Sequence, residues 1–586
     1  MIRERQKGAD ALSVSEDNLM IELEKISSDE MSLSVPYSMR GTAKALGDYR
    51  WDKALKKWCY PIDAEKIALM NATIPGLKTD LDLLRIQDRE EEQQEKLKEI
   101  KEFSPEHCKK LLDDRGYVPK VYAQDMAPFD HQYVAVVYGL AAIHFYGGYL
   151  LLDEMGVGKT PETLWAIEYL IKKGEIKEVY WFTPKGAKRS TLKKVALFTN
   201  LVAVSVEGTK AQRASILSRR AQIYIMNYAI AGIFEKELVP RMKGQAVVID
   251  EIQIMRNPKP VKFSKVIFSA VPKVKIGLTG TPVHNVPENL FMLIQWIRKS
   301  WRNRWSFFKR HIEYGGWQGH EIVGYKNMEQ LATRLDGISI RRIKDECLDL
   351  PAKTWDDKFL LMEGAQKKAY DLMKEECLLM WDDASDDDIR LGWANIKAQM
   401  TRLSQIADGF LSEGPDGKNE WIPGNCKERE LDELLRDYPD KIVVWGYFVY
   451  PIKHLYEKYK DKYGAVMLYG GTSERDREAA VDRFQTDPSC RVFIGQMGAG
   501  GVAIDLTAAS LHVFWKQSFV WSDNAQAEDR SHRIGMQDHL TIVRLIAEGT
   551  IDEFILKRSR HRQATARHLQ GDFPKLNKEL LLELFQ

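Results

Sequence analysis

The sequence predicts an α/β protein in which two domains built on parallel β-sheets carry helical insertions and follow a small β-rich (α+β) domain. Three observations support this class. From about residue 120, apolar runs of four to six residues alternate with helical stretches, and the same pattern returns after residue 440. Between them, residues 286–435 are rich in Trp, Lys, Arg and helix formers. Continuous apolar strands that alternate with helices are typical of a parallel sheet covered on both faces.

Each apolar run is assigned to one strand. In the first α/β domain the expected strands are GGYLLL (147–152), EVYWFTP (178–184), QIYIMNY (222–228), QAVVIDE (245–251) and KIGLTG (275–280). In the second they are KIVVWGYF (441–448), GAVMLYGG (464–471), CRVFIGQ (490–496), SLHVFWKQ (510–517) and TIVRLI (541–546).

The chain outside these domains has a different pattern. Residues 33–78 contain YRWDKALKKWCYP, with aromatic residues among lysines, and we expect short strands joined by turns. Residues 80–103 are dense in helix formers of mixed charge and predict a solvated linker helix. Residues 302–310, RNRWSFFKR, combine basic and aromatic side chains; packing against their own domain is favoured over stacking on a nucleic-acid base.

Composition narrows the class of protein. No apolar run reaches eighteen residues, and the N-terminus MIRERQKGAD lacks the apolar core of a signal peptide, so neither a membrane span nor secretion is expected. The six cysteines are scattered without a CxxC pair, which favours a reduced compartment over a disulfide framework or a zinc site. The net charge is +2, so any nucleic-acid binding must come from local basic patches.

A glycine-rich loop follows the first apolar strand. Residues 151–160 read LLDEMGVGKT, and the helical stretch TPETLWAIEYLIKK comes next. This is the context of a phosphate-binding loop, in which backbone N–H groups and a helix N-terminus surround the phosphates. Lys159 is expected to reach the β- and γ-phosphates and Thr160 to bind magnesium. One departure is Asp153, which stands where such loops usually begin with glycine.

A carboxylate pair follows another apolar strand. VVIDEIQ places Asp250 and Glu251 directly at the strand end. Asp250 is expected to hold magnesium through water, and Glu251 to orient and polarise the attacking water. The turn LTGTPVHN (278–285), with Gly280 and Thr281, follows a further strand and is interpreted as a link between this water site and the second domain.

Two arginines near the end of the second domain complete the set. QAEDRSHRIG (526–535) places Arg530 and Arg533 three residues apart, which puts them on one face of a helix. Guanidinium groups suit the charge that develops on a transferring phosphoryl group. The predicted catalytic residues are therefore Lys159, Asp250, Glu251, Arg530 and Arg533.

With these motifs the chain resembles the superfamily-two helicase-like motors of the Swi/Snf type over about residues 120–555. PFDHQ (128–132), DEMGVGKT (153–160), DEIQ (250–253), LTGTPVHN, IRRIKDECLDLP (340–351), GAGGVAIDLTAA (498–509) and QAEDRSHRIGM (526–536) are similar to motifs of that family in order. The chain departs from the usual pattern in having Gln253, Ala503, Asp505 and Met536, and SFVWSDN (518–524) in place of a W-N-P element.

The resemblance implies two RecA-like lobes that bind ATP and Mg2+ in the cleft between them. Gln132 is expected to contact the adenine base. The remaining nucleotide-binding residues that the resemblance implies are Asp153, Glu154, Met155, Gly156, Val157, Gly158, Lys159, Thr160, Gln253, Gly501, Asp505 and Gln526, with Thr160 and Asp250 as the magnesium ligands.

The resemblance also implies DNA contacts at motif positions. The candidates are Lys185, Lys188, Asn227, Gly280, Thr281 and Gln496. Contacts of this kind, made to the DNA backbone, give little sequence specificity but strong salt dependence.

Residues 33–78 are faintly similar to the HARP domain of annealing helicases, on the basis of VPYS, Tyr49, Trp58, Tyr60 and Pro61. In that family the module directs the motor to branched or forked DNA. A small β-rich recruiting or structural domain is the alternative, and the sequence does not decide between them.

The expected function is an ATP-dependent translocase on double-stranded DNA that remodels DNA or displaces bound proteins, with fork or branch activity if the HARP-like assignment holds. The alternatives are a conventional strand-separating helicase and an ATP-gated nucleic-acid clamp. We expect a monomer that binds duplex or branched DNA. Its expected location is cytoplasmic and DNA-associated if the source is bacterial or viral, and nuclear if the source is eukaryotic.

The expected domain boundaries follow from these assignments. They are a tail (1–32), the small HARP-like or recruiting domain (33–79), a helical linker (80–119), lobe 1 (120–300), helical insertions with the inter-lobe linker (301–435), lobe 2 (436–555) and a basic helical brace (556–586).

Overall fold

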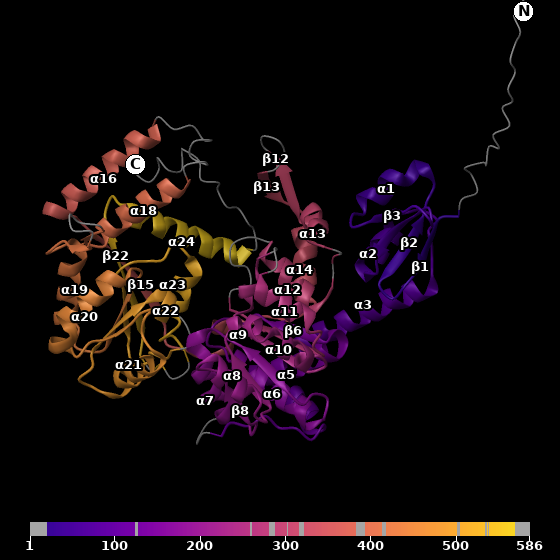
Figure 1. Ribbon diagram of the computed structural model, residues 1–586, viewed down its shortest axis with the longest axis horizontal. Coiled ribbons are helices and arrows are strands. Elements are labelled where there is room, and N and C mark those ends of the chain that lie inside the picture. The colour runs from indigo at the N-terminus through magenta and orange to yellow at the C-terminus, as the bar shows by residue number, and fades with distance from the viewer. Residues whose placement is uncertain are drawn as a thin grey trace, which may run out of the picture. The chain divides into compact units, whose positions relative to one another are not determined.

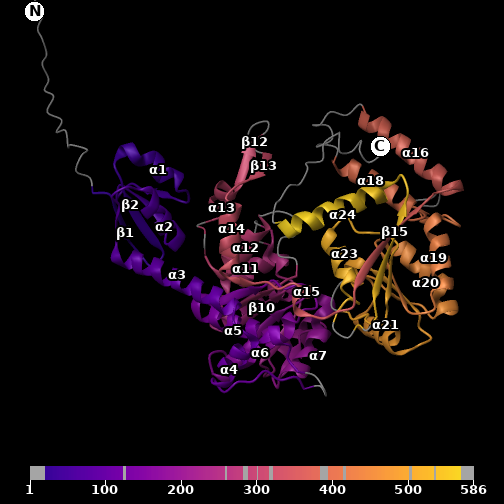
Figure 2. The ribbon, with the colours of Figure 1, turned by 180° about the vertical axis from the view of Figure 1, so that it is seen from behind.

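The computed structural model describes residues 20–122, 127–257, 261–280, 288–299, 301, 303–315, 321–382, 393–412, 418–500, 504–533, 536 and 538–568. The chain divides into two compact units, whose elements are labelled in Figure 1 and seen from behind in Figure 2. The first unit contains residues 1–103 and 294–338, and the second contains residues 104–293 and 339–586.

The first unit is built on a five-stranded sheet with the order β3-β4-β2-β1-β5. The strands are β1 (Glu22–Lys25), β2 (Glu30–Ser34), β3 (Arg50–Asp52), β4 (Lys57–Pro61) and β5 (Lys78–Thr79), and the helices are α1 (Arg40–Ala45), α2 (Ala64–Thr73) and α3 (Leu81–Lys101). The small domain therefore includes residues before 33, because β1 pairs with β2 and its Leu23 is fully buried. The core also contains Leu33, Tyr60 and Ile67.

Residues 294–338 belong to this first unit, and not with the insertions that follow them in the sequence. Their elements are the last residues of α12 (Asn289–Ile297), then α13 (Arg304–His311), β12 (Ile312–Gly315), β13 (Glu321–Tyr325) and α14 (Met328–Asp336). These residues group with the small domain because of a set of ion pairs that no local sequence pattern predicts. Arg334 of α14 pairs with Asp63 (3.1 Å) and Glu65 (2.7 Å), and Lys101 of α3 pairs with Asp336 (2.7 Å).

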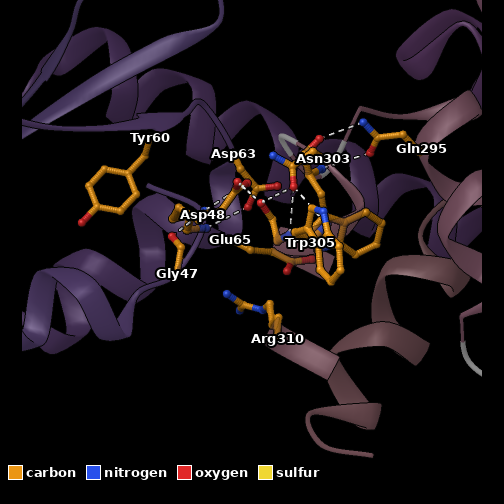
Figure 3. A network of polar contacts seen from close by, with 12 residues as sticks. Gly47, Asp48, Tyr60, Asp63, Glu65, Gln295, Asn303, Trp305 and Arg310 are labelled. Atoms are coloured by element: carbon orange, nitrogen blue, oxygen red, sulfur yellow. Dashed lines mark hydrogen bonds and ion pairs between the residues drawn. The ribbon is translucent and has the colours of Figure 1, made fainter. Parts of the chain in front are cut away.

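Figure 3 shows part of this network, with Asp48, Asp63 and Glu65 on the side of the small domain and Asn303, Trp305 and Arg310 on the side of α13. Although burial works against ionisation of Asp63, the charges of Arg334, Arg298 and Lys66 hold its pKa below the ordinary value. The network therefore joins the small domain to residues 294–338, and its Arg334–Asp63 pair is largely withdrawn from water.

Lobe 1 of the second unit is a seven-stranded sheet with the order β14-β6-β11-β10-β7-β9-β8, all of whose neighbouring strands run parallel. Its strands are β6 (Gly148–Leu151), β7 (Val179–Phe182), β8 (Ala203–Ser205), β9 (Ile223–Met226), β10 (Ala246–Asp250), β11 (Val274–Leu278) and β14 (Ser339–Ile340). Its helices are α4 (Pro105–Asp113), α5 (Asp130–Tyr146), α6 (Lys159–Lys172), α7 (Lys188–Phe198), α8 (Lys210–Leu217), α9 (Tyr228–Ile233), α10 (Glu235–Met242) and α11 (Lys262–Ser269).

Lobe 2 is a six-stranded sheet with the order β15-β22-β21-β18-β20-β19, again parallel throughout. Its strands are β15 (Lys353–Leu360), β18 (Ile442–Gly446), β19 (Val466–Leu468), β20 (Val492–Gln496), β21 (Leu511–Phe514) and β22 (Leu540–Ala547). The helices of this part of the chain are α15 (Lys344–Cys347), α16 (Gly364–Asp382), α18 (Trp393–Ala407), α19 (Cys426–Asp437), α20 (Val449–Tyr463), α21 (Glu474–Thr486), α22 (Met497–Gly500), α23 (Trp521–Glu528) and α24 (Ile551–His568).

Helices cover both faces of the lobe 2 sheet (Figure 1). Ile442 and Val444 of β18 pack against α19 and α20, whereas Val443 and Trp445 face α21, α22 and α23. This alternation along one strand is the reason its sequence is apolar at every position. All ten runs assigned to strands from the sequence contain a strand, so the predicted fold class is confirmed.

Two lysines and two aspartates form a buried cluster inside lobe 2. Lys427 at the start of α19 donates to Asp408 (2.9 Å) and to the carbonyl of Trp515 (2.8 Å), and its ammonium lies 2.7 Å from Asp552 of α24. Lys516 pairs with Asp552 as well. The two lysines and two aspartates connect the end of α18, the start of α19, the end of β21 and the start of α24.

No helix in the described ranges combines the length and apolar character that crossing a membrane requires.

Candidate functional site

The phosphate loop, the carboxylate pair and the segment of residues 278–280 lie at one edge of the lobe 1 sheet. β6, β11 and β10 are neighbours and run parallel, so their carboxyl ends meet at this edge. Ligands of open parallel sheets bind at the carboxyl ends of the strands. The chain therefore brings together here three motifs that begin at residues 153, 250 and 278 of the sequence.

The loop after β6 has the backbone that phosphate binding needs. Gly156 and Gly158 have φ values of 88° and 121°, which residues with a side chain rarely adopt. Lys159 begins α6, and its Nζ donates to the carbonyl oxygens of Asp153 (2.6 Å) and Glu154 (3.0 Å). Burial lowers the pKa of Lys159, an effect that nearby carboxylates, first among them Asp153 and then Glu251, oppose.

The carboxylate pair lies half-buried at the end of β10. The hydroxyl of Thr183, at the end of the neighbouring β7, donates to Asp250 Oδ2 (3.0 Å), and Gln253 Nε2 donates to Glu251 Oε2 (2.6 Å). Burial raises the pKa of both carboxyls, and for Glu251 the adjacent Asp250 charge adds to the rise. A carboxylate with a raised pKa is suited to take up a proton from water.

Glu251 also has a backbone that a non-glycine residue adopts at a cost. Its φ is 53°, in the left-handed region. The Tyr228 hydroxyl donates to the carbonyl of Asp250 (2.6 Å) and so holds the preceding peptide. Such strain of about 1–3 kcal/mol is typical of catalytic and binding positions and is maintained by the surrounding contacts.

The arginine segment of lobe 2 lies against the phosphate loop. A Cβ placed on Gly156 would lie 3.5 Å from Cβ of Arg533. Burial and, after it, the charge of Arg533 lower the pKa of Arg530 to about 9, and the Glu251 carboxylate opposes the shift. Arg533 Nε donates to the Asp529 carbonyl (3.0 Å) and its Nη1 to the Ile504 carbonyl (3.3 Å). Elements of both lobes therefore meet around one loop.

The other residues expected to bind nucleotide have varied surroundings. Gln132 is 3% exposed, its Oε1 accepts from the Phe129 amide (2.9 Å), and its amide lies beside Gly158. Met155 packs on Gly280, whose added Cβ would lie 2.9 Å from Met155 Cγ. Val157 is buried, Thr160 and Gln526 are half-buried, and Asp505 is exposed. Thr281 and Gly501 lie outside the described residues.

The candidate DNA-contact residues are not equally available. Lys185 is exposed in a short 3-10 turn (Lys185–Ala187). Lys188 is only 3% exposed, and its ammonium pairs with Glu207 (3.1 Å) of lobe 1 and Glu474 (3.4 Å) of lobe 2. The Lys188 ammonium therefore lies in ion pairs with two carboxylates, whereas a contact with the DNA backbone was expected. Asn227 is the N-cap residue of α9, and Gln496 accepts from the Gly470 amide (3.1 Å) and donates to the Tyr447 carbonyl (3.2 Å).

Two groups of residues at this site were missed by the sequence reasoning. The first is Lys194 of α7. Burial, together with the charges of Arg533, Arg530 and Lys159, lowers its pKa to about 8, and Asp250 opposes the shift, so this lysine lies near the same charged groups. The second is Arg342, which lies among Asp153, Glu162 and His131. Lys194 carries no sequence signal of its own. Arg342 lies within IRRIKDECLDLP (340–351), whose likeness to the family was the signal that could have been used.

Magnesium fits the residues present, although no group of three or more His, Cys, Asp or Glu side chains within the described part of the chain is arranged to hold a metal. Mg2+ prefers oxygen ligands and usually takes only one or two from the protein, the others coming from phosphates and water. The Thr160 hydroxyl and the half-buried Asp250 carboxylate supply oxygens of this kind next to the phosphate loop.

Two family models match the chain. The SNF2-related domain matches residues 129–408, and the helicase conserved C-terminal domain matches residues 426–535. These ranges include the phosphate loop and the carboxylate pair in the first case and the arginine pair in the second.

Curated relatives match along the same region. The ISWI chromatin-remodeling complex ATPase ISW1 of Saccharomyces cerevisiae is 26% identical over 70% of this chain and 38% of its own length. The DNA annealing helicase and endonuclease ZRANB3 of Homo sapiens is 26% identical over 74% of this chain and 40% of its own. The SWI/SNF-related matrix-associated actin-dependent regulator of chromatin subfamily A-like protein 1 of Xenopus tropicalis is 24% identical over 90% of this chain and 53% of its own. The chain thus spans about half or less of the length of these relatives.

Among solved structures, the Sulfolobus solfataricus SWI2/SNF2 ATPase core in complex with dsDNA covers 76% of this chain and 95% of its own, at 21% identity and a TM-score of 0.37. The motifs at the sheet edge, the arginine pair and the two matched family models agree with one another. The chain belongs to the Swi/Snf-type, superfamily-two helicase-like ATPases.

Proposed function

We propose that the protein is an ATP-dependent translocase on double-stranded DNA that remodels DNA structures or displaces bound proteins. The observation that carries the proposal is the meeting of two lobes at one phosphate loop: Lys159, Asp250 and Glu251 come from lobe 1, and Arg533 of lobe 2 lies against Gly156. Because the site is divided between the lobes, ATP binding and hydrolysis change the position of one lobe relative to the other.

The chain's own residues have distinct tasks in this proposal. Loop amides and Lys159 bind the phosphates, while Thr160 and Asp250 hold Mg2+, which would neutralise charge between the phosphates when bound. Glu251 orients the attacking water and accepts its proton. Arg530 and Arg533 stabilise the charge that develops on the transferring phosphoryl group. The DNA backbone is bound by exposed groups such as Lys185.

The test is ATP turnover by the full chain without DNA and with single strands, duplex or forked DNA. We expect duplex to stimulate turnover more than single strands do, and stimulation to fall as salt rises, because backbone contacts release counterions. Displacement of a labelled strand would favour a conventional helicase. Turnover that stays near zero on every DNA, with ATP-dependent DNA retention, would favour a clamp.

We also propose that the small domain of the first unit directs the protein to forked or branched DNA. The printed name of the human relative describes a DNA annealing helicase, and the alignment to the Xenopus relative covers enough of the chain to reach into the small domain. An aromatic–basic face supports the proposal. Its members are Tyr37, Arg40, Lys44, Tyr49, Trp51 and Trp58.

This face has the features of a surface for unpaired bases. Trp51 and Trp58 are cross-strand partners whose rings lie 4.8 Å apart, and Trp51 remains 44% exposed. Arg40 lies over the Tyr37 ring at 4.2 Å, and the Tyr37 side chain is 67% exposed. Exposed aromatic rings beside cations stack on the bases of single-stranded segments, such as those at a fork.

Trp51→Ala is expected to weaken binding to forked DNA by about 5- to 100-fold, since losing one base stack costs about 1–3 kcal/mol. Duplex-stimulated ATP turnover should stay unchanged. The measurement is fluorescence anisotropy with forked and blunt duplex DNA at one salt concentration. The matched control is Trp355→Ala, because Trp355 lies on β15 of lobe 2 and is also 44% exposed.

Deletion of the small domain is a poor test, because charged residues of 294–338 would then lose their ion-pair partners. Without Asp63 and Glu65, Arg334 would lose both of its carboxylates. An equal loss of fork and duplex binding in Trp51→Ala, or no loss at all, would contradict the assignment.

A further inference from the structure

The segment that leads from lobe 1 to lobe 2 runs alongside the phosphate loop. β14 pairs with β6, and the pairing continues beyond both strands: the Leu152 amide donates to the Ile340 carbonyl (2.9 Å), and the Glu154 amide donates to the Arg342 carbonyl (3.0 Å). The segment then continues through α15 to β15, the first strand of lobe 2. The covalent connection between the lobes is therefore hydrogen-bonded to the loop that holds the phosphates.

Arg342 fixes this segment to lobe 1. Its guanidinium pairs with Asp153 and with Glu162 of α6 (2.7 Å to Glu162 Oε2), and donates to the carbonyl of His131 at the start of α5. Its backbone amide donates to Asp153 Oδ1 (2.8 Å). Asp153 and Glu162 are fully buried, so Arg342 neutralises carboxylates that water does not reach.

Lys344, two residues further on, reaches lobe 2. Its amide donates to Glu154 Oε2 (2.9 Å), which keeps its backbone on the phosphate loop. Its ammonium donates to Asp529 Oδ1 (2.7 Å) and to the carbonyl of His532 (2.8 Å). Lys344 is 4% exposed, so this charge is withdrawn from water and depends on these partners.

Each of the two residues to which the Lys344 ammonium donates is a sequence neighbour of one of the two arginines. Asp529 directly precedes Arg530, and His532 directly precedes Arg533. The Asp529 carbonyl in turn accepts from Arg533 Nε (3.0 Å), and His532 Nε2 is hydrogen-bonded to the carbonyl of Pro351 (3.0 Å). The position of both arginines relative to the phosphate loop thus depends on contacts with the inter-lobe segment.

We propose that Lys344 is a positioning residue for ATP hydrolysis. Anchored to the phosphate loop through its own backbone and through Arg342, it holds the Asp529–Arg533 segment so that both arginine side chains meet the terminal phosphate. The proposal concerns the chemical step and does not depend on which DNA the protein acts on. Its failure is thus distinguishable from failure of the proposed translocase function.

The experiment is Lys344→Met in the full chain, measured by single-turnover ATP hydrolysis without DNA and by titration with a fluorescent ATP analogue. Hydrolysis is expected to fall about 10- to 100-fold, because a misplacement of about 1 Å costs up to about 100-fold in rate. Analogue affinity should change by less than about threefold, because Lys344 is paired with protein groups. Lys344→Arg should restore most of the rate, since a guanidinium can still donate to Asp529.

The matched control is Lys358→Met. Lys358 lies on β15, the strand that follows the inter-lobe segment, and pairs with Glu430 at 2.6 Å. Its partner belongs to α19 and not to the arginine segment. This variant should hydrolyse ATP at the original rate.

Two results would overturn the proposal: an unchanged hydrolysis rate in Lys344→Met, or a loss of analogue affinity equal to the loss of rate. If Lys344→Met melts well below the original protein, Asp529→Asn takes its place, because it keeps a side-chain oxygen and removes only the charge. A reduced rate at unchanged affinity in that variant supports the positioning role, and an unchanged rate refutes it.

Discussion

Lys159→Ala is expected to remove ATP hydrolysis, lowering turnover by about a hundred- to a thousandfold or more, and to weaken nucleotide binding. The reason is the charge around the loop. The ammonium of Lys159 lies among the carboxylates of Asp153, Glu251, Asp250 and Glu162. Without it, the phosphates of ATP would meet a strongly acidic edge of the sheet with one fewer cation.

The measurement is phosphate release at saturating MgATP with duplex DNA, together with equilibrium binding of a fluorescent ATP analogue. Glu251→Gln is the informative comparison, because it should keep nucleotide affinity while losing turnover. Lys172→Ala is the matched control: it removes an ammonium from the last turn of the same helix, where the lysine side chain is 54% exposed. Turnover at the original rate in Lys159→Ala would refute the assignment of the phosphate loop.

The two sheets could be predicted from the sequence because parallel strands buried on both faces leave a signal at every residue. IVVW in β18 and VYWF in β7 are apolar throughout, and their strand ends carry the motifs. The motif residues Lys159, Asp250 and Glu251 each follow such a strand in a recognisable motif, so they could be grouped from the sequence. The strand order that places them at one edge comes from the structure.

Other strands could not be predicted, for physical reasons that differ. β15 reads KTWDDKFL, with charges at half of its positions, because it is an edge strand paired on one side alone to β22. β14 is two residues long and is defined by its partner β6 rather than by its own composition. The grouping of residues 294–338 with the small domain rests on Arg334 and its carboxylates, which are about 270 residues apart in the sequence.

The same reasoning explains what was missed at the site. Arg342 and Lys344 belong to a motif whose likeness to the family was visible, but their partners Asp153 and Asp529 lie about 190 residues away on either side. Lys188 was a candidate DNA contact because of its motif position just after the strand EVYWFTP, whereas its pairing with Glu207 and Glu474 became visible only in three dimensions. Ion pairs between residues so far apart in the sequence produce no periodic pattern from which they could be predicted.

Lys427→Met is expected to destabilise lobe 2 by about 3–5 kcal/mol, the usual cost of leaving a buried charge without its partner. Lys427 is fully buried, and all three of its donor positions are used, on Asp408, Asp552 and the Trp515 carbonyl. Burial raises the pKa of Asp408, and the Lys427 charge is the strongest opposing influence. Without that charge the Asp408 carboxyl would be protonated or pull water into the core.

The effect is measured as the shift of the urea midpoint for proteolytic cleavage of lobe 2, because a chain of several domains does not unfold in two states. Lys367→Met is the control, since Lys367 pairs with Asp371 at 3.0 Å on the exposed side of α16 and should leave the midpoint unchanged. Lys427→Met combined with Asp408→Asn should recover part of the lost stability. Removing both charges leaves less buried charge without a partner than removing the lysine charge alone. A double variant that is less stable than Lys427→Met would show that the lysine acts through packing of its stem and not through its charge. In that case α18 and α24 would be held to the sheet by their apolar contacts alone.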